Sequence, residues 1–347
     1  MAGQMLMLGF RGTELAGDNP IVADIRDRHL GGVILFSEDL PSGEPTRNVE
    51  SRDQLTRLCG ALRAEAARPL LIAVDQEGGA VSRLRPEHGF PATRSHAELG
   101  ALDDTTETRR ESATVARRLA STGINLNLAP VVDLDTNPAN PVIGALGRSF
   151  SDAPEVVTRH AQAFIEGHRA YGILTAPKHF PGHGSSEGDT HQGFVDVSAT
   201  WNEAELEPYR ALVSGRLARM VMVAHVFNAA LDEVFPASLS HATVTGLLRD
   251  EIGFDGVIIT DDLQMGAISG RWAFEDAIRH AINAGADIVI YANQLEDFDP
   301  GLGQRAHDTI VALVESGDIR RERVEASYRR IMALKAQLPS PPTRHRA

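Results

Sequence analysis

Residues 171–193, with the sequence YGILTAPKHFPGHGSSEGDTHQG, form the most informative stretch of this chain. A short apolar run, Ile173–Ala176, leads into a glycine-rich stretch that carries three histidines, a lysine, a glutamate and an aspartate. A buried strand followed by a loop of this kind is how parallel α/β folds usually carry an active site. The stretch therefore predicts a β-strand and a loop with a chemical role.

Similar apolar runs recur along the chain. We expect eight strands, at Met5–Phe10, Gly32–Phe36, Leu70–Asp75, Ile124–Pro130, Ile173–His179, Met220–His225, Gly256–Asp261 and Ala286–Ala292. Segments with helical periodicity lie between them, at Arg109–Thr122, Val156–Tyr171, Glu203–Gly215, His241–Ile252 and Phe274–Ala284. Apolar strands that alternate with helices indicate a buried parallel sheet, and eight such units predict an α/β fold of the (β/α)8 TIM-barrel type. A doubly wound open sheet is the alternative, but no Gly-x-Gly-x-x-Gly follows the first strand.

We expect residues 1–338 to form a single catalytic domain that ends in a helix at Arg320–Gln337. Residues 339–347 contain three prolines, and we expect them to form a disordered tail. Two connections between strand and helix are long, Asp133–Arg148 and Pro181–Trp201. In a barrel, long loops of this type surround the mouth where active sites are built.

Composition restricts the class of partner. The formal net charge is −13 and is spread along the chain, which argues against nucleic acid or an anionic membrane surface as a main partner. No stretch reaches the ~18 apolar residues that span a bilayer. The N-terminus lacks a basic region and a cleavage site, so we expect a cytoplasmic protein; secretion or a periplasmic location stays open if a leader was removed. The single cysteine, Cys59, is expected to be a buried thiol.

Polar residues follow five of the expected strands. They are Asp75, then Asp133 and Asp135, then Lys178 and His179, then His225, and finally Thr260, Asp261 and Asp262. Because the carboxyl ends of all barrel strands surround one mouth, these side chains are expected to converge. Each has an ordinary structural alternative: Asp75 as a helix cap, His225 as a buried histidine, and one of the two adjacent aspartates as a cap.

The residue types favour hydrolysis or group transfer. Asp261 ends a buried strand, a rigid platform for a nucleophile, and His191 on the glycine-rich loop is suited to acid/base work. Asp189 lies two residues before His191, where it can orient the imidazole ring and stabilise its charged form. The rival from similar residues is a zinc hydrolase that uses His179, His183, His191 and Asp261, although the first strand lacks the expected His-x-His.

Several motifs together resemble glycoside hydrolase family 3, and more narrowly its β-N-acetylglucosaminidase (β-N-acetylhexosaminidase) branch. The sequence KHFPGHG at 178–184 with Asp189-Thr190-His191 is similar to that branch's signature loop, and ITDDLQM at 259–265 is similar to its nucleophile motif. Further similar stretches are IAVDQEGG at 72–79 with Arg83, NLAPVVD at 127–133, GRSF at 147–150 and PASLS at 236–240. The resemblance runs in order from about residue 3 to about residue 338.

This resemblance implies a retaining glycosidase in which Asp261 forms a covalent glycosyl-enzyme and a His191–Asp189 pair supplies the acid/base. It also implies that the terminal N-acetylglucosamine is bound by Asp75, Arg83, Arg148, Lys178 and His179. The chain resembles the single-domain form of the branch, with no cofactor or metal, and a monomer is expected. The implied substrates are small carbohydrates or muropeptides derived from peptidoglycan.

Two features depart from the branch's pattern. Ser185–Gly188 is a variant spacer, and Gln192-Gly193 follows the histidine where many relatives have apolar residues and proline. The aglycone and the preference between N-acetylglucosamine and N-acetylgalactosamine therefore stay open. A phosphorylase remains an alternative, because a histidine acid/base does not repel a phosphate acceptor. A sugar-binding barrel without turnover is an alternative of another class.

Overall fold

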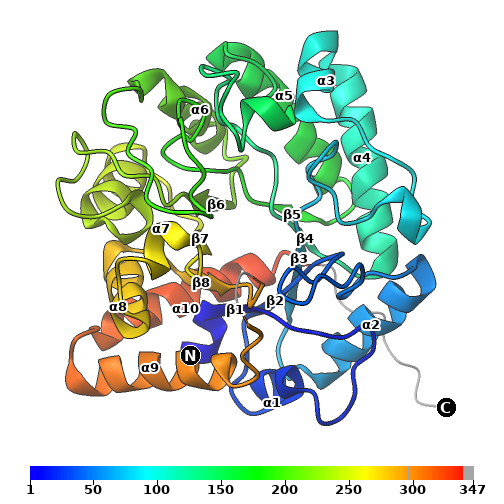
Figure 1. Ribbon diagram of the computed structural model, residues 1–347, viewed down its shortest axis with the longest axis vertical. Coiled ribbons are helices and arrows are strands. Elements are labelled where there is room, and N and C mark those ends of the chain that lie inside the picture. The colour runs from blue at the N-terminus through cyan, green and yellow to red at the C-terminus, as the bar shows by residue number, and fades with distance from the viewer. Residues whose placement is uncertain (295–296, 339–347) are drawn as a thin grey trace.

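The computed structural model describes residues 1–294 and 297–338, which form a barrel of parallel strands surrounded by helices (Figure 1). The strands are β1 (Leu6–Gly9), β2 (Gly32–Leu35), β3 (Leu71–Val74), β4 (Leu126–Asn127), β5 (Leu174–Thr175), β6 (Met220–Val223), β7 (Val257–Asp262) and β8 (Ile288–Tyr291). They pair in the order β5-β4-β3-β2-β1-β8-β7-β6. The predicted (β/α)8 architecture is confirmed, and the predicted tail, 339–347, lies outside the described residues.

The barrel closes between β5 and β6 through the residues that follow β5. The Phe180 N–H donates to the Met222 carbonyl at 2.9 Å, and the Met222 N–H donates to the Pro177 carbonyl at 3.0 Å. The Ala224 N–H donates to the Phe180 carbonyl at 2.8 Å. The segment that predicted the fold therefore closes the barrel at its mouth.

The helices lie outside the strands (Figure 1). They are α1 (Pro20–Arg26), α2 (Arg52–Glu65), α3 (His96–Leu102), α4 (Thr105–Thr122), α5 (Pro154–Arg169), α6 (Glu207–Ser214), α7 (Gly266–Ser269), α8 (Phe274–Ala284), α9 (Leu302–Ser316) and α10 (Arg321–Lys335). Five 3₁₀ turns occur in the described residues, η1 (Ala2–Met5), η2 (Pro86–His88), η3 (Gly144–Leu146), η4 (Glu203–Leu206) and η5 (Ala237–Leu239), with one π-helix, η6 (Ala242–Glu251). None of the helices in residues 1–294 and 297–338 is long and apolar enough to cross a membrane.

The strands are buried on both faces, as their continuous apolar sequences require. All four residues of β1, β2, β3, β6 and β8 are buried. At the amino ends of the strands, α10 is joined to the core by Lys335, which donates to the Gln4 side chain and to the Gly31 carbonyl, both at 2.7 Å. Burial lowers the pKa of Lys335 to about 7.

Several predicted boundaries were wrong by a few residues. β4 ends at Asn127 and β5 at Thr175, because Pro130 and Pro177 have no N–H to continue a ladder. α4 begins at Thr105 rather than Arg109, since the Asp104 carboxylate caps it by accepting from two backbone N–H groups. The predicted helix at 241–252 is a π-helix.

Candidate active site

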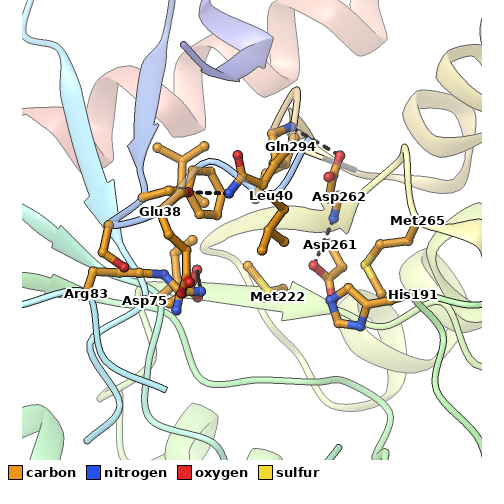
Figure 2. A pocket seen from close by; sticks show the side chains of 16 residues that line it. Glu38, Leu40, Asp75, Arg83, His191, Met222, Asp261, Asp262, Met265 and Gln294 are labelled. Carbon is orange, nitrogen blue, oxygen red and sulfur yellow. Dashed lines mark hydrogen bonds and ion pairs between the residues drawn. The ribbon is translucent and has the colours of Figure 1, made fainter. Parts of the chain in front are cut away.

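A pocket of about 170 Å³ opens at the carboxyl ends of the strands (Figure 2). Five residues that the sequence analysis singled out line it, Asp75, Arg83, His191, Asp261 and Asp262. Figure 2 shows Asp75 and Arg83 on one side of the pocket and Asp261 and His191 on the other, pointing toward each other. The pocket therefore brings together residues from the segment after β3, from the end of β7 and from the long loop after β5.

Asp261 lies near the end of β7, where the pairing with β8 is irregular between Ile259 and Asp262. Irregularities of this kind redirect side chains beside active sites. The Asp261 Oδ1 atom accepts the N–H of Asp262 at 2.8 Å. Burial by itself raises the pKa of the Asp261 carboxyl, but three neighbouring imidazole rings, led by His225, outweigh it and lower this pKa to about 2. Asp261 is therefore a carboxylate at any neutral pH.

The adjacent Asp262 has a different environment. Its Oδ1 atom accepts the N–H groups of Gln264 at 3.1 Å and Ala292 at 3.2 Å, and so ties the end of β7 to the end of β8. Burial raises the pKa of Asp262 to about 7. The sequence suggested that one of the two aspartates is a cap, and the contacts of Asp262 are of that kind.

His191 is carried by the segment 181–201, which we name the acid/base loop after the role that the sequence predicts for His191. The His191 Nδ1 atom lies 2.7 Å from Asp189 Oδ1, which also accepts the His191 N–H at 2.8 Å. This leaves Nε2 as the ring nitrogen available to a ligand in the pocket. A carboxylate on one nitrogen of a histidine fixes its tautomer and stabilises the imidazolium.

The tip of the acid/base loop rests on α7, directly after the strand that carries Asp261. Backbone N–H groups of Gly266 and Ala267 donate to the carbonyls of His191 at 3.1 Å and Thr190 at 3.0 Å. A Cβ atom on Gly266 would lie only 2.9 Å from the His191 carbonyl oxygen, so glycine permits this close approach. The position of His191 beside Asp261 is thus set by backbone contacts.

On the opposite side of the pocket, four charged side chains form one network. Lys178 Nζ lies 2.7 Å from both the Asp75 and the Glu77 carboxylates. Arg148 donates two hydrogen bonds of 2.8 Å to Glu77. Although burial opposes it, Arg148 and Lys178 hold the pKa of Glu77 well below its usual range. Asp75 also lies 3.7 Å from Arg83.

The sequence prediction gave Glu77 no role, yet it is the centre of this network. Its side chain is fully buried, whereas Asp75 reaches the pocket. One signal was available: Glu77 lies two residues after Asp75, and in extended backbone such side chains point the same way. Lys178 and Arg148 are not among the residues that line the pocket, and they lie behind Asp75.

His179 is held in one orientation by a buried carboxylate. Its Nδ1 atom lies 2.7 Å from Asp133 Oδ2, and its Nε2 atom lies 3.3 Å from Arg148 Nη2. The same Asp133 accepts the backbone N–H groups of His179 at 3.1 Å and His183 at 2.9 Å. His183 is buried, with Nε2 3.3 Å from the Thr190 hydroxyl, and does not line the pocket.

His225 is a fully buried histidine with both ring nitrogens engaged. Nδ1 lies 2.7 Å from the Ser238 hydroxyl, and Nε2 donates to the Asp262 carbonyl at 2.9 Å. Burial lowers its pKa, so the ring is neutral at pH 7. It supports the end of β7 from behind.

The alternative zinc set is not assembled in the described part of the chain. Residues 1–294 and 297–338 contain no group of three or more His, Cys, Asp or Glu side chains placed to hold a metal ion. The candidates are divided instead: His179 faces Asp133, and His191 faces Asp189.

The remaining wall of the pocket comes from the loops after β2 and β8. The buried Arg47 donates to the Asn293 carbonyl at 2.8 Å and also bonds the Gln294 side chain. Gln294 in turn donates to the Glu38 carbonyl at 2.6 Å. This wall presents Leu40, an apolar side chain that lines the pocket while 59% of its surface is exposed.

Comparisons with known proteins agree with this geometry. Residues 2–334 match the glycosyl hydrolase family 3 N terminal domain. The chain is 34% identical to beta-hexosaminidase A of Pseudoalteromonas piscicida, over 98% of this chain and 61% of that protein. Among solved structures, a family 3 beta-N-acetylglucosaminidase from Paenibacillus sp. FPU-7 superposes with a TM-score of 0.88 at 35% identity, covering 99% of this chain and 63% of that one.

A second solved structure matches over nearly its full length. Beta-N-acetylhexosaminidase from Beutenbergia cavernae has a TM-score of 0.86 and 32% identity, covering 96% of this chain and 97% of that one. The chain spans about three fifths of the Pseudoalteromonas and Paenibacillus proteins. The chain belongs to glycoside hydrolase family 3.

Proposed function

We propose that this chain is a retaining exo-β-N-acetylglucosaminidase that removes a terminal, non-reducing N-acetylglucosamine through a covalent glycosyl-enzyme on Asp261. The observation that carries the proposal is a half-buried, ionised carboxylate, Asp261, which lines the pocket beside His191, whose Nδ1 atom is held by Asp189. The family relatives named above, which are β-hexosaminidases and β-N-acetylglucosaminidases, support the sugar specificity.

In the first step, the Asp261 oxygen that is not bonded to the Asp262 N–H attacks the anomeric carbon. The glycosidic C–O bond breaks, and the leaving oxygen takes a proton from His191 Nε2. In the second step, His191 Nε2 removes a proton from water, the water oxygen bonds the anomeric carbon, and the Asp261 ester breaks. Asp189 stabilises the imidazolium form of His191 before the first transfer and after the second.

The charged network around Glu77 is suited to hold the sugar hydroxyls. Asp75 lines the pocket and accepts hydrogen bonds as a carboxylate, while Arg83 donates from the same side. Lys178 holds Asp75, and Arg148 lies beside His179; the three side chains are further donors for a sugar that reaches them. Charge-assisted hydrogen bonds from one side of a pocket suit a terminal sugar unit.

The nucleophile is tested with a chromogenic β-N-acetylglucosaminide. Asp261→Ala is expected to lose at least ~10³-fold in kcat, since no covalent intermediate can form. A slow fluorinated glycosyl donor is expected to label the wild-type peptide that contains Asp261, detected by mass spectrometry. Near-wild-type turnover by Asp261→Ala, or a label on another residue, would overturn the assignment.

We further propose muropeptides derived from peptidoglycan as the natural substrates. Product analysis on muropeptides and on chitobiose, with and without phosphate, tests this proposal. Release of free N-acetylglucosamine, preferentially from muropeptides, supports it; formation of N-acetylglucosamine 1-phosphate identifies a phosphorylase. Sugar binding without any product would indicate a binding protein, and loss of activity with a chelator would favour the metal alternative.

A further inference from the structure

A buried carboxyl group that the proposed chemistry does not use lies under the base of the acid/base loop. Glu205, in η4, is fully buried, and its Oε2 atom accepts the Gly184 N–H at 3.1 Å. Its other oxygen, Oε1, has no hydrogen-bond partner among the described residues. Glu205 therefore touches the loop from below through one oxygen.

The loop is shaped to lie on this carboxyl. A Cβ atom on Gly182, whose φ is +124°, would lie 2.4 Å from Glu205 Oε2, and one on Gly184 would lie 1.7 Å from the Leu134 carbonyl oxygen. Neither position has room for a side chain. Glycine at these two positions thus lets the loop backbone lie close to Glu205 and to Leu134. Glycine is needed there because a side chain has no room, and not because the loop must be flexible.

Two carboxyl groups together hold the start of the loop. Asp133 accepts the N–H groups of His179 and His183, and Glu205 accepts that of Gly184, so consecutive parts of the backbone are held from two sides. At the far end of the loop, the Trp201 Nε1 atom donates to the Pro181 carbonyl at 3.0 Å and closes the loop's base. We call the carboxyl groups of Asp133 and Glu205 the anchor of the loop base. This anchor is separate from the contact of the loop tip with α7.

The groups that face Glu205 are Asp133 after β4, Ser185 in the loop and Tyr209 on α6. The Tyr209 hydroxyl is buried without a partner among the described residues. Burial, reinforced by the charge of Asp133, raises the pKa of Glu205 to about 8. At neutral pH the anchor thus contains one anion, Asp133, and one neutral acid, Glu205.

We propose that Glu205 is a positioning residue: its neutral carboxyl seats the base of the acid/base loop and so keeps His191 beside Asp261. The acid/base role of His191 itself rests on the proposed function. Ionisation of Glu205 would place a second buried anion beside Asp133 and loosen the base, so the loop is expected to open as the pH rises past 8. The serines of the variant spacer, Ser185 and Ser186, are both buried, and Ser185 faces Glu205.

Three variants test the proposal. Glu205→Ala removes the anchor, and Glu205→Gln keeps a neutral oxygen that accepts the Gly184 N–H. Glu203→Ala is a matched control, because Glu203 lies in the same turn but 70% of its side chain is exposed. Thermal unfolding establishes that each variant is folded before its loop is examined.

The first readout does not depend on catalysis. Glu187 is the exposed glutamate of the loop, so a glutamate-specific protease reports loop opening through the fragment that ends at this residue. Glu205→Ala is expected to speed this cleavage about tenfold at pH 7, the effect of losing one buried hydrogen bond. At pH 7, Glu205→Gln and Glu203→Ala are expected to be cleaved at the wild-type rate. At pH 9, the wild type and Glu203→Ala are expected to be cleaved faster than at pH 7, whereas Glu205→Gln is expected to keep its slow rate.

The second readout is the dependence of kcat on the leaving group. Glu205→Ala is expected to lose about tenfold with poor leaving groups and much less with activated ones, with little change in KM, because the proton donor is misplaced. Equal losses of kcat across leaving groups, or cleavage of Glu205→Ala at the wild-type rate, would overturn the proposal. A Glu205→Gln variant that failed to restore the wild-type cleavage rate and kcat would also overturn it. An inactive wild type with the expected proteolysis pattern would refute the glycosidase assignment and leave the anchor intact.

Discussion

Replacing Glu77 with glutamine is a sharp test of the charged network beside the pocket. Glu77 receives two hydrogen bonds from Arg148 and one contact from Lys178, all within 2.8 Å, and none of its side chain is exposed. Glutamine keeps the shape but removes the charge. The variant leaves Arg148 as a buried cation without its carboxylate, while Lys178 keeps Asp75.

Removing one partner of a buried ion pair lowers the free energy of unfolding by about 3–5 kcal/mol. Because Asp75 still compensates Lys178, the lower limit, ~3 kcal/mol, is the better expectation for Glu77→Gln. An unfolding entropy of ~2.1 cal/mol/K per residue gives ~0.7 kcal/mol per degree for a chain of this length, so Tm should fall by roughly 4 °C. Sugar binding should also weaken, and KM should rise, because Lys178 and Arg148 lose their shared partner.

The pH dependence has a defined sign. The folded pKa of Glu77 is lowered, so its stabilising effect is fully present above the unfolded value of ~4.3 and is lost as the pH falls through the folded value. The difference in stability between wild type and Glu77→Gln should therefore stay constant from pH 5 to pH 8 and shrink below about pH 4.

The assay is urea unfolding followed by circular dichroism, combined with KM for the chromogenic substrate. Glu87→Gln is the control, because 58% of that side chain is exposed and its ion pair with Arg85 is 3.7 Å long. The control should change stability by less than ~0.5 kcal/mol. A Glu77→Gln protein within about 1 kcal/mol of wild type at pH 7, with an unchanged KM, would refute this account of the network.

Two other predictions concern the loop tip and the amino ends of the strands. Gly266→Ala should push the acid/base loop off α7, because the new Cβ would lie 2.9 Å from the His191 carbonyl oxygen. We expect kcat to fall at least ~10-fold. An unchanged kcat would contradict the docking of the loop on α7. Lys335→Met should abolish the part of the pH dependence of the unfolding free energy that comes from the Lys335 amine. The folded pKa of Lys335 is lowered to about 7, so the unfolded chain binds the extra proton between pH 7 and pH 10. The wild type should accordingly gain stability relative to Lys335→Met as the pH rises through that window. Thermal unfolding at pH 6 to 9 measures this gain, and parallel curves of Tm against pH for the two proteins would contradict the prediction.

The fold was readable from the sequence because each strand is a continuous apolar run that the barrel buries on both faces. The limits of the strands were harder to predict, since they depend on which backbone groups find partners. Pro130 and Pro177 lie inside apolar runs that look like strand, yet they cannot donate to a ladder. Similarly, α4 begins at its Asp104 cap, before the periodic part of its sequence.

The site was partly readable for a related reason. Asp75 directly follows β3 and Asp261 lies near the end of β7, so topology alone brings them to the mouth, and the spacing of Asp189 and His191 predicts their contact. Glu77 was missed because its role depends on Arg148, which lies far along the chain and becomes its neighbour only after folding. Glu205 gave no local signal at all, because an acidic residue at the start of a helical segment is ordinary in any sequence.

The closure of the barrel between β5 and β6 has a consequence for synthesis of the protein. The charged network around Glu77, through Lys178, is complete in the chain well before Asp261 is made. However, the backbone of Phe180 pairs with Met222 in β6 and with Ala224 just after it, and Asp261 is made only with β7. A nascent chain that ends before β6 therefore lacks the strand on which Phe180 pairs, although it already contains the residues of this network. Hydrolytic activity should appear in one step late in translation, when the last strands pair, rather than growing with the length of the chain.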